Sequence, residues 1–113
     1  MTNIDKSNQR TLGLLGSKIR EIREQRGLLL RQIAAHLEVD TALMSRIERG
    51  ERKPSKEMIY KLSHYLDTDP ATLLKLWVAD RIYYAIDEEV SMAEEAMELV
   101  KKTLKDEAGS QAD

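Results

Sequence analysis

The sequence has 113 residues, the length of one domain, and 34% of them are charged. It contains no cysteine, which excludes disulfides and thiolate metal sites, and two histidines alone make a poor metal site. No apolar run is long enough to span a membrane and no signal peptide is recognisable. We therefore expect a cytoplasmic protein without cofactor, metal or membrane association.

The formal net charge of −2 conceals an uneven distribution along the chain. Residues 1–66 carry 13 Lys and Arg against 8 Asp and Glu, whereas residues 67–113 carry 5 against 12. A basic first half suggests that this part meets a polyanion and that the acidic tail does not. Chance segregation of the charges is the alternative.

The first residues, 1–12, are polar without apolar periodicity and are predicted to form a flexible arm. An arm reaching along DNA through Lys6 and Arg10 is the alternative. A helix is predicted from residue 14 to 26, with Gly27 as its C-cap.

Two short helices around a tight turn are predicted next, over residues 30–37 and about 41–48. Asp40 can accept hydrogen bonds from the first amides of the second of these helices. Met44 and Ile47 can anchor that helix to the core. This pattern is typical of a helix-turn-helix that offers its second helix to the DNA major groove.

Two longer helices are expected after a basic loop over residues 51–54. Ser55 can cap the first of them, and Asp69 followed by Pro70 predicts that the next begins at residue 70 and runs to about 86. Ser91 and Glu94 form a possible capping box for a last helix, with fraying expected from residue 108. Its apolar residues are spaced 3, 4, 3, 4, which is a heptad seam: Val90, Ala93, Met97, Val100 and Leu104. A helix–helix dimer and packing back on its own domain are the two alternatives for this seam.

Candidate DNA-contacting residues cluster on and around residues 41–48. The residues expected to face base edges are Thr41, Ala42, Ser45 and Arg46. Arg46 is the sharpest candidate because a guanidinium can bond guanine O6 and N7 together, with a phosphate contact or surface ion pair as the alternative. The residues expected to meet phosphates are Arg31, Arg49, Arg52, Lys53 and Lys56.

Three segments carry a family resemblance: residues 19–27 (Ile-Arg-Glu-Ile-Arg-Glu-Gln-Arg-Gly), residues 33–37 (Ile-Ala-Ala-His-Leu) and residues 44–54, which end in Ile-Glu-Arg-Gly-Glu-Arg-Lys-Pro. From residue 14 to about 76 the sequence resembles the lambda-repressor-like, Xre-type helix-turn-helix family. The resemblance implies an all-α, compact five-helix DNA-binding domain over residues 13–78. Residues 79–113 are then expected to be an additional C-terminal helical extension that mediates dimerisation.

The same resemblance implies that Arg23 and Glu48 form an internal ion pair, which gives Arg23 a structural role despite its charge. The sequence departs from the family where the second helix begins. Leu29 and Leu30 replace the usual Ser-Gln or Thr-Gln, so a cap and a phosphate contact should be lost, with Arg31 as possible compensation. Among the three leucines that start at Leu28, we expect Leu28 in the core and one of the other two partly exposed.

Large amphipathic side chains follow the expected end of the five-helix core. We expect a dimer interface formed by Trp77, Ile82, Tyr83, Tyr84 and Met97, because aromatic residues are enriched at the centres of interfaces and little core remains for them to fill. A contact with the last helix of their own chain is the alternative.

Two functions are compatible with these features. The first is a transcriptional regulator that binds a palindromic operator as a homodimer, similar to the controller proteins of restriction–modification operons and to small phage-type repressors. The second is a protein-interaction module such as an antitoxin, which would hold a protein partner through the tail from Ser91 onward. No phosphate-binding loop or catalytic arrangement is recognisable, so we do not expect an enzyme.

Overall fold

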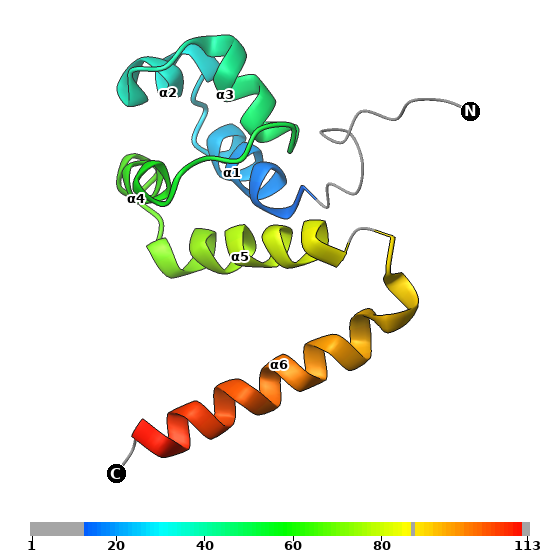
Figure 1. Cartoon of the computed structure of the whole chain (residues 1–113). Coiled ribbons are helices and arrows are strands. Elements are labelled where there is room, and N and C mark those ends of the chain that lie inside the picture. Colours follow the sequence, from blue (N-terminus) through cyan, green and yellow to red (C-terminus); the bar gives the residue numbers. More distant parts are fainter. Residues whose placement is uncertain (1–12, 87, 112–113) are drawn as a thin grey trace, which may run out of the picture.

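The computed structural model describes residues 13–86 and 88–111, so the expected arm over residues 1–12 lies outside the described residues. The described part is all-α, which confirms the predicted fold class. Its helices are α1 (Leu14–Gln25), α2 (Leu30–Leu37), α3 (Thr41–Glu48), α4 (Lys56–Tyr65), α5 (Pro70–Ile86) and α6 (Val90–Gln111). Helices α1 to α5 gather into one domain, and α6 runs away from it (Figure 1).

Side chains near the helix starts explain where three of the helices begin. The Asp40 carboxylate accepts a hydrogen bond from the Leu43 amide at 2.7 Å, and the Ser55 hydroxyl accepts one from the Met58 amide at 3.1 Å. The Asp69 carboxylate accepts one from the Ala71 amide at 3.0 Å. These acceptors satisfy amides that have no partner inside the helix, so the predicted starts of α3, α4 and α5 are confirmed.

The core of the domain is built from all five of its helices and from none of α6. Burial of these apolar side chains is the main force that holds the short helices together, since helices of eight residues are not stable alone. The buried apolar residues are Leu15, Ile19, Ile22, Ile33, Ala34, Leu37, Met44, Ile47, Ile59, Leu62, Leu66 and Leu73.

Two contacts fix α1 against helices that are distant in the sequence. A Cβ atom added to Gly16 would lie 2.5 Å from the Ile47 carbonyl oxygen, so only glycine lets α1 approach the end of α3 this closely. At the start of α1, the two carboxylate oxygens of Asp80 accept hydrogen bonds from the Leu14 and Leu15 amides, each at 3.0 Å. Helix α5 therefore caps α1 across 66 residues of sequence.

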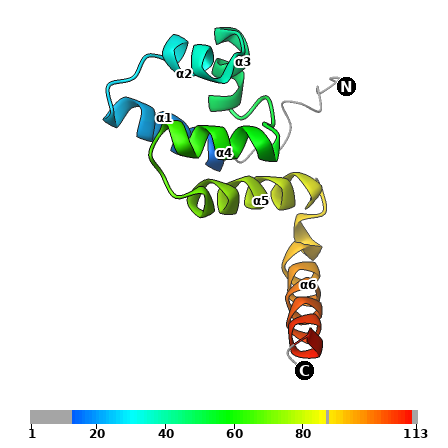
Figure 2. The ribbon, with the colours of Figure 1, turned by 90° about the vertical axis from the view of Figure 1, so that its left-hand side faces the viewer.

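Helix α6 differs from the expectation at both ends. It begins at Val90, so Ser91 lies inside the first turn and is not the N-cap of a capping box. It also continues to Gln111, past the point where fraying was expected. The view turned by 90° shows α6 leaving the domain beyond the end of α5 (Figure 2). Within the described residues, no helix is long and apolar enough to cross a membrane.

Candidate nucleic-acid interface

Helix α3 has one face in the core and the opposite face in solvent. Met44, Ile47 and Glu48 are buried, whereas Thr41, Ala42 and Arg46 are exposed and Ser45 is half-buried. Because each residue turns an α-helix by about 100°, the four expected base-reading residues lie on one arc of about 140°, with Arg46 and Ala42 farthest from the buried side chains and Thr41 at the edge of the arc. The Arg46 side chain has no hydrogen bond or ion pair to another described residue.

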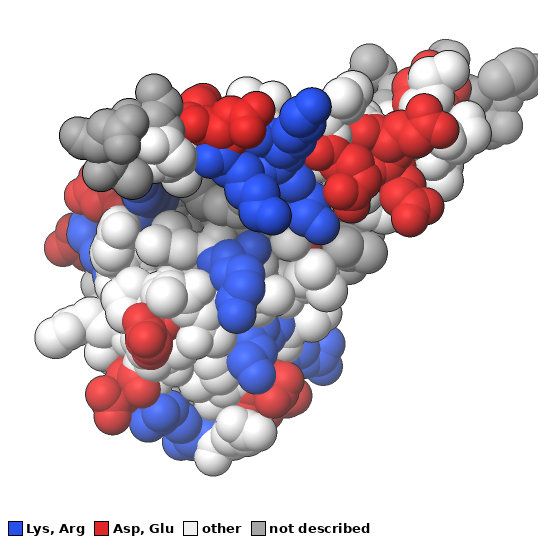
Figure 3. Space-filling view, turned by 90° about the horizontal axis from the view of Figure 1, so that it is seen from below, with Lys and Arg blue, Asp and Glu red and all other residues white. Residues whose placement is uncertain are grey.

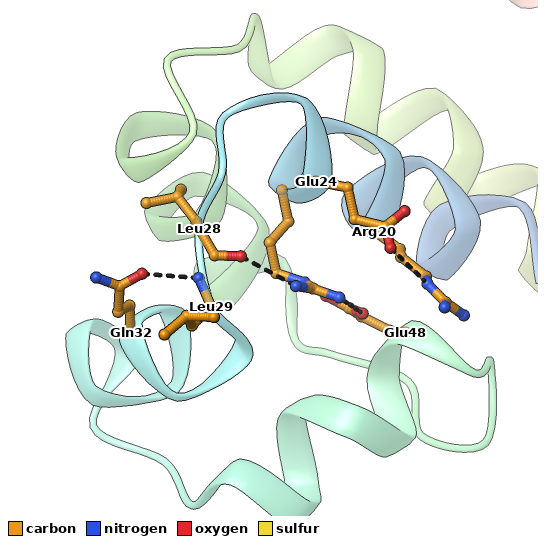
Figure 4. A network of polar contacts seen from close by, with 7 residues as sticks. Arg20, Glu24, Leu28, Leu29, Gln32 and Glu48 are labelled. Carbon is orange, nitrogen blue, oxygen red and sulfur yellow. Dashed lines mark hydrogen bonds and ion pairs between the residues drawn. The ribbon is translucent and has the colours of Figure 1, made fainter.

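A buried ion pair holds the end of α3 against α1. The Arg23 guanidinium donates two hydrogen bonds to the Glu48 carboxylate, from Nε at 2.7 Å and from Nη2 at 3.1 Å. Its third nitrogen, Nη1, donates to the Leu28 carbonyl at 3.0 Å (Figure 4). The hydrogen bonds to Glu48 raise the pKa of the Arg23 guanidinium above its ordinary value, although burial opposes them. The side chains of Arg23 and Glu48 are only 14% and 5% exposed, so each charge depends on the other.

The start of α2 keeps part of a cap despite the two leucines. Leu29 has no side-chain acceptor, but the Gln32 side-chain oxygen accepts a hydrogen bond from the Leu29 amide at 2.7 Å (Figure 4). This is one half of a capping box, so the expectation that the cap is lost is only partly correct. Leu28 and Leu30 pack against the core, and Leu29 is the exposed member of the three.

The expected phosphate-contacting residues are all exposed, but their surroundings differ. Arg31, Arg52 and Lys56 form no ion pair with any described side chain. Arg49 forms an ion pair with Glu51 at 3.0 Å. The pair is exposed and contributes little stability, so a phosphate can replace Glu51 as the partner of Arg49. The Lys53 ammonium lies 5.4 Å from the centre of the Tyr84 ring, a cation–π contact with α5.

The aromatic residues of α5 hold the loop that follows α3. The Trp77 indole donates a hydrogen bond to the Pro54 carbonyl at 2.9 Å, and the Arg81 guanidinium lies 4.6 Å from the centre of the indole ring. Trp77 also packs against the hydrophobic core. The expectation that Trp77 has little core left to fill is therefore wrong, because its ring packs against the core and its indole finds an acceptor in the Pro54 carbonyl. Tyr84 likewise contacts this loop, through Lys53.

The other residues expected at a dimer interface remain largely accessible. Ile82 is 45% exposed, Tyr84 is 43% exposed and Met97 is 40% exposed, whereas Tyr83 is half-buried. Ile82 and Met97 lie on opposite sides of an apolar hollow between the end of α5 and the start of α6. Ile82 and Met97 therefore line the same hollow. Trp77 instead contacts the loop that follows α3, through its hydrogen bond to the Pro54 carbonyl.

Three residues that shape this surface were missed in the sequence. Gly16 and Asp80 place α1 relative to α3 and α5, and Gln32 caps the start of α2. Gln32 lies three residues after the N-cap of α2, which is the capping-box spacing, so a sequence signal existed for it. Gly16 and Asp80 act on distant segments, and no local pattern marks them.

Nothing in the described part of the chain points to metal chemistry. No group of three or more histidine, aspartate or glutamate side chains there is arranged to hold a metal ion. The ring of His36 stacks on Tyr65 with the ring centres 4.2 Å apart, which is a packing contact.

Residues 19–73 match the helix-turn-helix family HTH_3, so the chain contains an Xre-like helix-turn-helix domain of the class found in transcriptional regulators. The chain is 41% identical over 64 residues to uncharacterised HTH-type transcriptional regulators of Mycobacterium bovis and Mycobacterium tuberculosis. That match covers 57% of this chain but only 25% of each relative.

Solved structures give the same fold. The clp gene regulator ClgR from Corynebacterium glutamicum is 25% identical, with a TM-score of 0.54 over 82% of this chain and 88% of that chain. An HTH_3 family transcriptional regulator from Vibrio cholerae is 22% identical, with a TM-score of 0.50 over 63% of this chain and 39% of that chain. The latter likeness shows the fold alone.

Proposed function

We propose that this protein is a sequence-specific DNA-binding transcriptional regulator that acts as a homodimer on a palindromic operator. Each subunit inserts α3 into a major groove, and the two half-sites lie about one helical turn apart, roughly 34–36 Å. The observation that carries the proposal is the outer face of α3, where Thr41, Ala42 and Arg46 are exposed while Met44 and Ile47 are buried.

Base reading is assigned first to Arg46. Its side chain is exposed and has no partner among the described residues, so its hydrogen-bonding capacity is unused in the free protein. A guanidinium in this state can bond both acceptors of a guanine in the major groove. Thr41 and Ala42 then meet neighbouring bases, and a thymine methyl suits either side chain.

Phosphate binding is assigned to the residues that surround α3. Arg31, at the start of α2, and Arg49, Arg52, Lys53 and Lys56, after α3, supply positive charge beside the reading helix. The loop over residues 51–54 is held by Trp77 and Tyr84, so its cations are presented from a fixed backbone. These contacts supply affinity and register and carry no sequence information.

Selection of bound sequences from a random DNA pool is the test. We expect a palindromic motif from the unaltered protein, and we expect Arg46→Ala to lose about 1–3 kcal/mol of preference at one base pair in each half-site. Arg52→Ala should weaken all sites alike and reduce the slope of log affinity against log salt by about one per chain. Lys75→Ala, an exposed lysine of α5 outside this surface, is the matched control. Enrichment of no motif above bulk DNA would remove the proposal.

One observation favours a second candidate function. The last helix exposes Val90, Val100 and Leu104, which suits a module that binds a different protein, as an antitoxin does. The mass of the purified chain separates the two functions. A homodimer with a folded α6 supports the regulator, and a tail that becomes ordered only with a co-purified partner supports the interaction module.

A further inference from the structure

The apolar seam of α6 is not covered by residues 13–86 or by any other described part of the chain. Val90, Val100 and Leu104 are 55%, 57% and 59% exposed, although they repeat at the spacing of a coiled-coil seam. Figures 1 and 2 show why: α6 leaves the domain and runs away from it. A helix in water is stabilised mainly by burying such a face, so the seam needs a partner.

The seam continues into a hollow at the base of α6. Ile82 and Ile86 of α5 line one side of this hollow, and Ala93, Met97 and Val100 of α6 line the other. Three residues of the seam therefore also line the hollow. A helix laid along the seam would fill the hollow with its own apolar side chains.

The charges beside the seam identify the occupant and its direction. Residues 88–98 contain five glutamates and no lysine or arginine, whereas the second half of α6 carries Lys101, Lys102 and Lys105 together with Asp106 and Glu107. The face of α6 seen from below shows both signs of charge along the helix (Figure 3). A second α6 that runs in the opposite direction brings the three lysines of each copy toward the acidic half of the other copy.

We propose that a second copy of this chain covers the seam, with the two α6 helices antiparallel. Met97 then faces Val100 of the partner subunit, and Ala93 faces Leu104 of the partner subunit, so a small side chain meets a large one. In this register Glu94 lies beside Lys101 of the partner subunit, and the dimer contains this attractive pair twice.

A parallel pair fits the sequence less well. Parallel helices bring Glu94 beside Glu89 of the partner subunit, a like-charge contact, and no lysine relieves it. They also place Ala93 opposite Ala93 of the partner subunit, which leaves a gap in the seam. Charge and side-chain size therefore both favour the antiparallel arrangement. The inference rests on the proposed homodimer and specifies how its subunits are joined.

Single-cysteine cross-linking tests the direction, because the natural sequence has no cysteine. Ala93→Cys and Leu104→Cys are prepared separately and also co-expressed, oxidised and examined on a non-reducing gel. In the antiparallel pair, identical positions lie about 16 Å apart along the axis, beyond disulfide reach. We expect a cross-linked dimer from the co-expressed pair only. The inference would be overturned if either variant cross-linked with itself, or if the co-expressed pair gave no cross-linked dimer.

Charge reversal provides a second test that needs no oxidation. Glu94→Lys should raise the dissociation constant of the dimer on the order of tenfold, and Glu94→Lys combined with Lys101→Glu should restore it. Helix content measured by circular dichroism shows that each variant is folded. No recovery in the double variant contradicts the antiparallel register. A parallel cross-linking pattern would leave the proposed DNA-binding homodimer standing, because operator selection tests that proposal separately.

Discussion

The five-helix domain and α6 use the same kind of sequence pattern with opposite results. In the domain, apolar residues at helical spacing such as Ile19 and Leu73 are fully buried. In α6, residues at equally regular spacing such as Leu104 remain 59% exposed. The spacing of apolar residues predicts that a helix has an apolar face, but it does not predict what covers that face. The five-helix domain buries its own apolar face, and α6 leaves its apolar face exposed.

Removing one leucine from each region should give the largest contrast. We expect Leu73→Ala to lower the free energy of unfolding by about 3–4 kcal/mol, because a fully buried side chain leaves a cavity. Leu104→Ala should change domain stability by less than about 0.5 kcal/mol and weaken self-association. Leu99→Ala, exposed and outside the seam, is the control for the second variant. Denaturant unfolding at low protein concentration measures the first effect.

The buried ion pair should give the next largest effect. Glu48→Ala leaves the Arg23 guanidinium without its carboxylate partner, and we expect a loss of about 2–3 kcal/mol, reduced by the remaining 14% exposure of Arg23. Glu24→Ala, which breaks an exposed pair with Arg20, should cost at most about 0.5 kcal/mol. Urea unfolding measures both variants. If Glu48→Ala and Glu24→Ala lowered the free energy of unfolding equally, the buried pair would contribute no more than the exposed pair.

The cap that α5 supplies to α1 should contribute less. Asp80→Ala removes the acceptor of the Leu14 and Leu15 amides, and we expect the free energy of unfolding to fall by about 1–2 kcal/mol. Asp80→Asn keeps one side-chain oxygen and should recover part of this loss. Thermal unfolding followed by circular dichroism provides the measurement, and an unchanged midpoint in Asp80→Ala would show that the two hydrogen bonds contribute nothing.

The smallest predicted effect concerns the loop beside α3. Trp77→Phe keeps an aromatic ring against the core but cannot donate to the Pro54 carbonyl, so we expect a loss of about 1 kcal/mol. The same variant should bind DNA more weakly, because the loop that carries Lys53 is held less firmly. Affinity for the selected operator measures this consequence. If Trp77→Phe has unaltered stability and unaltered DNA affinity, the hydrogen bond from Trp77 does not stabilise the loop.

Local chemistry made most of the fold predictable. Asp40, Ser55 and Asp69 are acceptors placed directly before helical segments, and the observed helices begin where these residues predict. The motif over residues 44–54 was sufficient to identify the helix-turn-helix family. The outer face of α3 followed from the positions of Met44 and Ile47, because the inner residues of a helix determine which residues face outward.

Contacts between distant segments could not be predicted in the same way. Asp80 lies in the middle of α5, and its partners are amides more than sixty residues earlier, so no spacing rule connects them. Gly16 is required because the end of α3 packs directly against it, and the local sequence around Gly16 does not reveal this contact. The hydrogen bond from Trp77 to the Pro54 carbonyl could not be predicted either, because tertiary packing alone brings the two groups together.

The central claim is that the five-helix domain is complete in one chain and that the seam of α6 is not. Sedimentation equilibrium of the unaltered chain and of Val100→Lys at micromolar concentration tests it most directly. We expect about twice the single-chain mass of 13.0 kDa for the unaltered chain, and the single-chain mass for Val100→Lys with an unchanged unfolding midpoint of the domain. A single-chain mass for both, or a dimer of both, would contradict the claim.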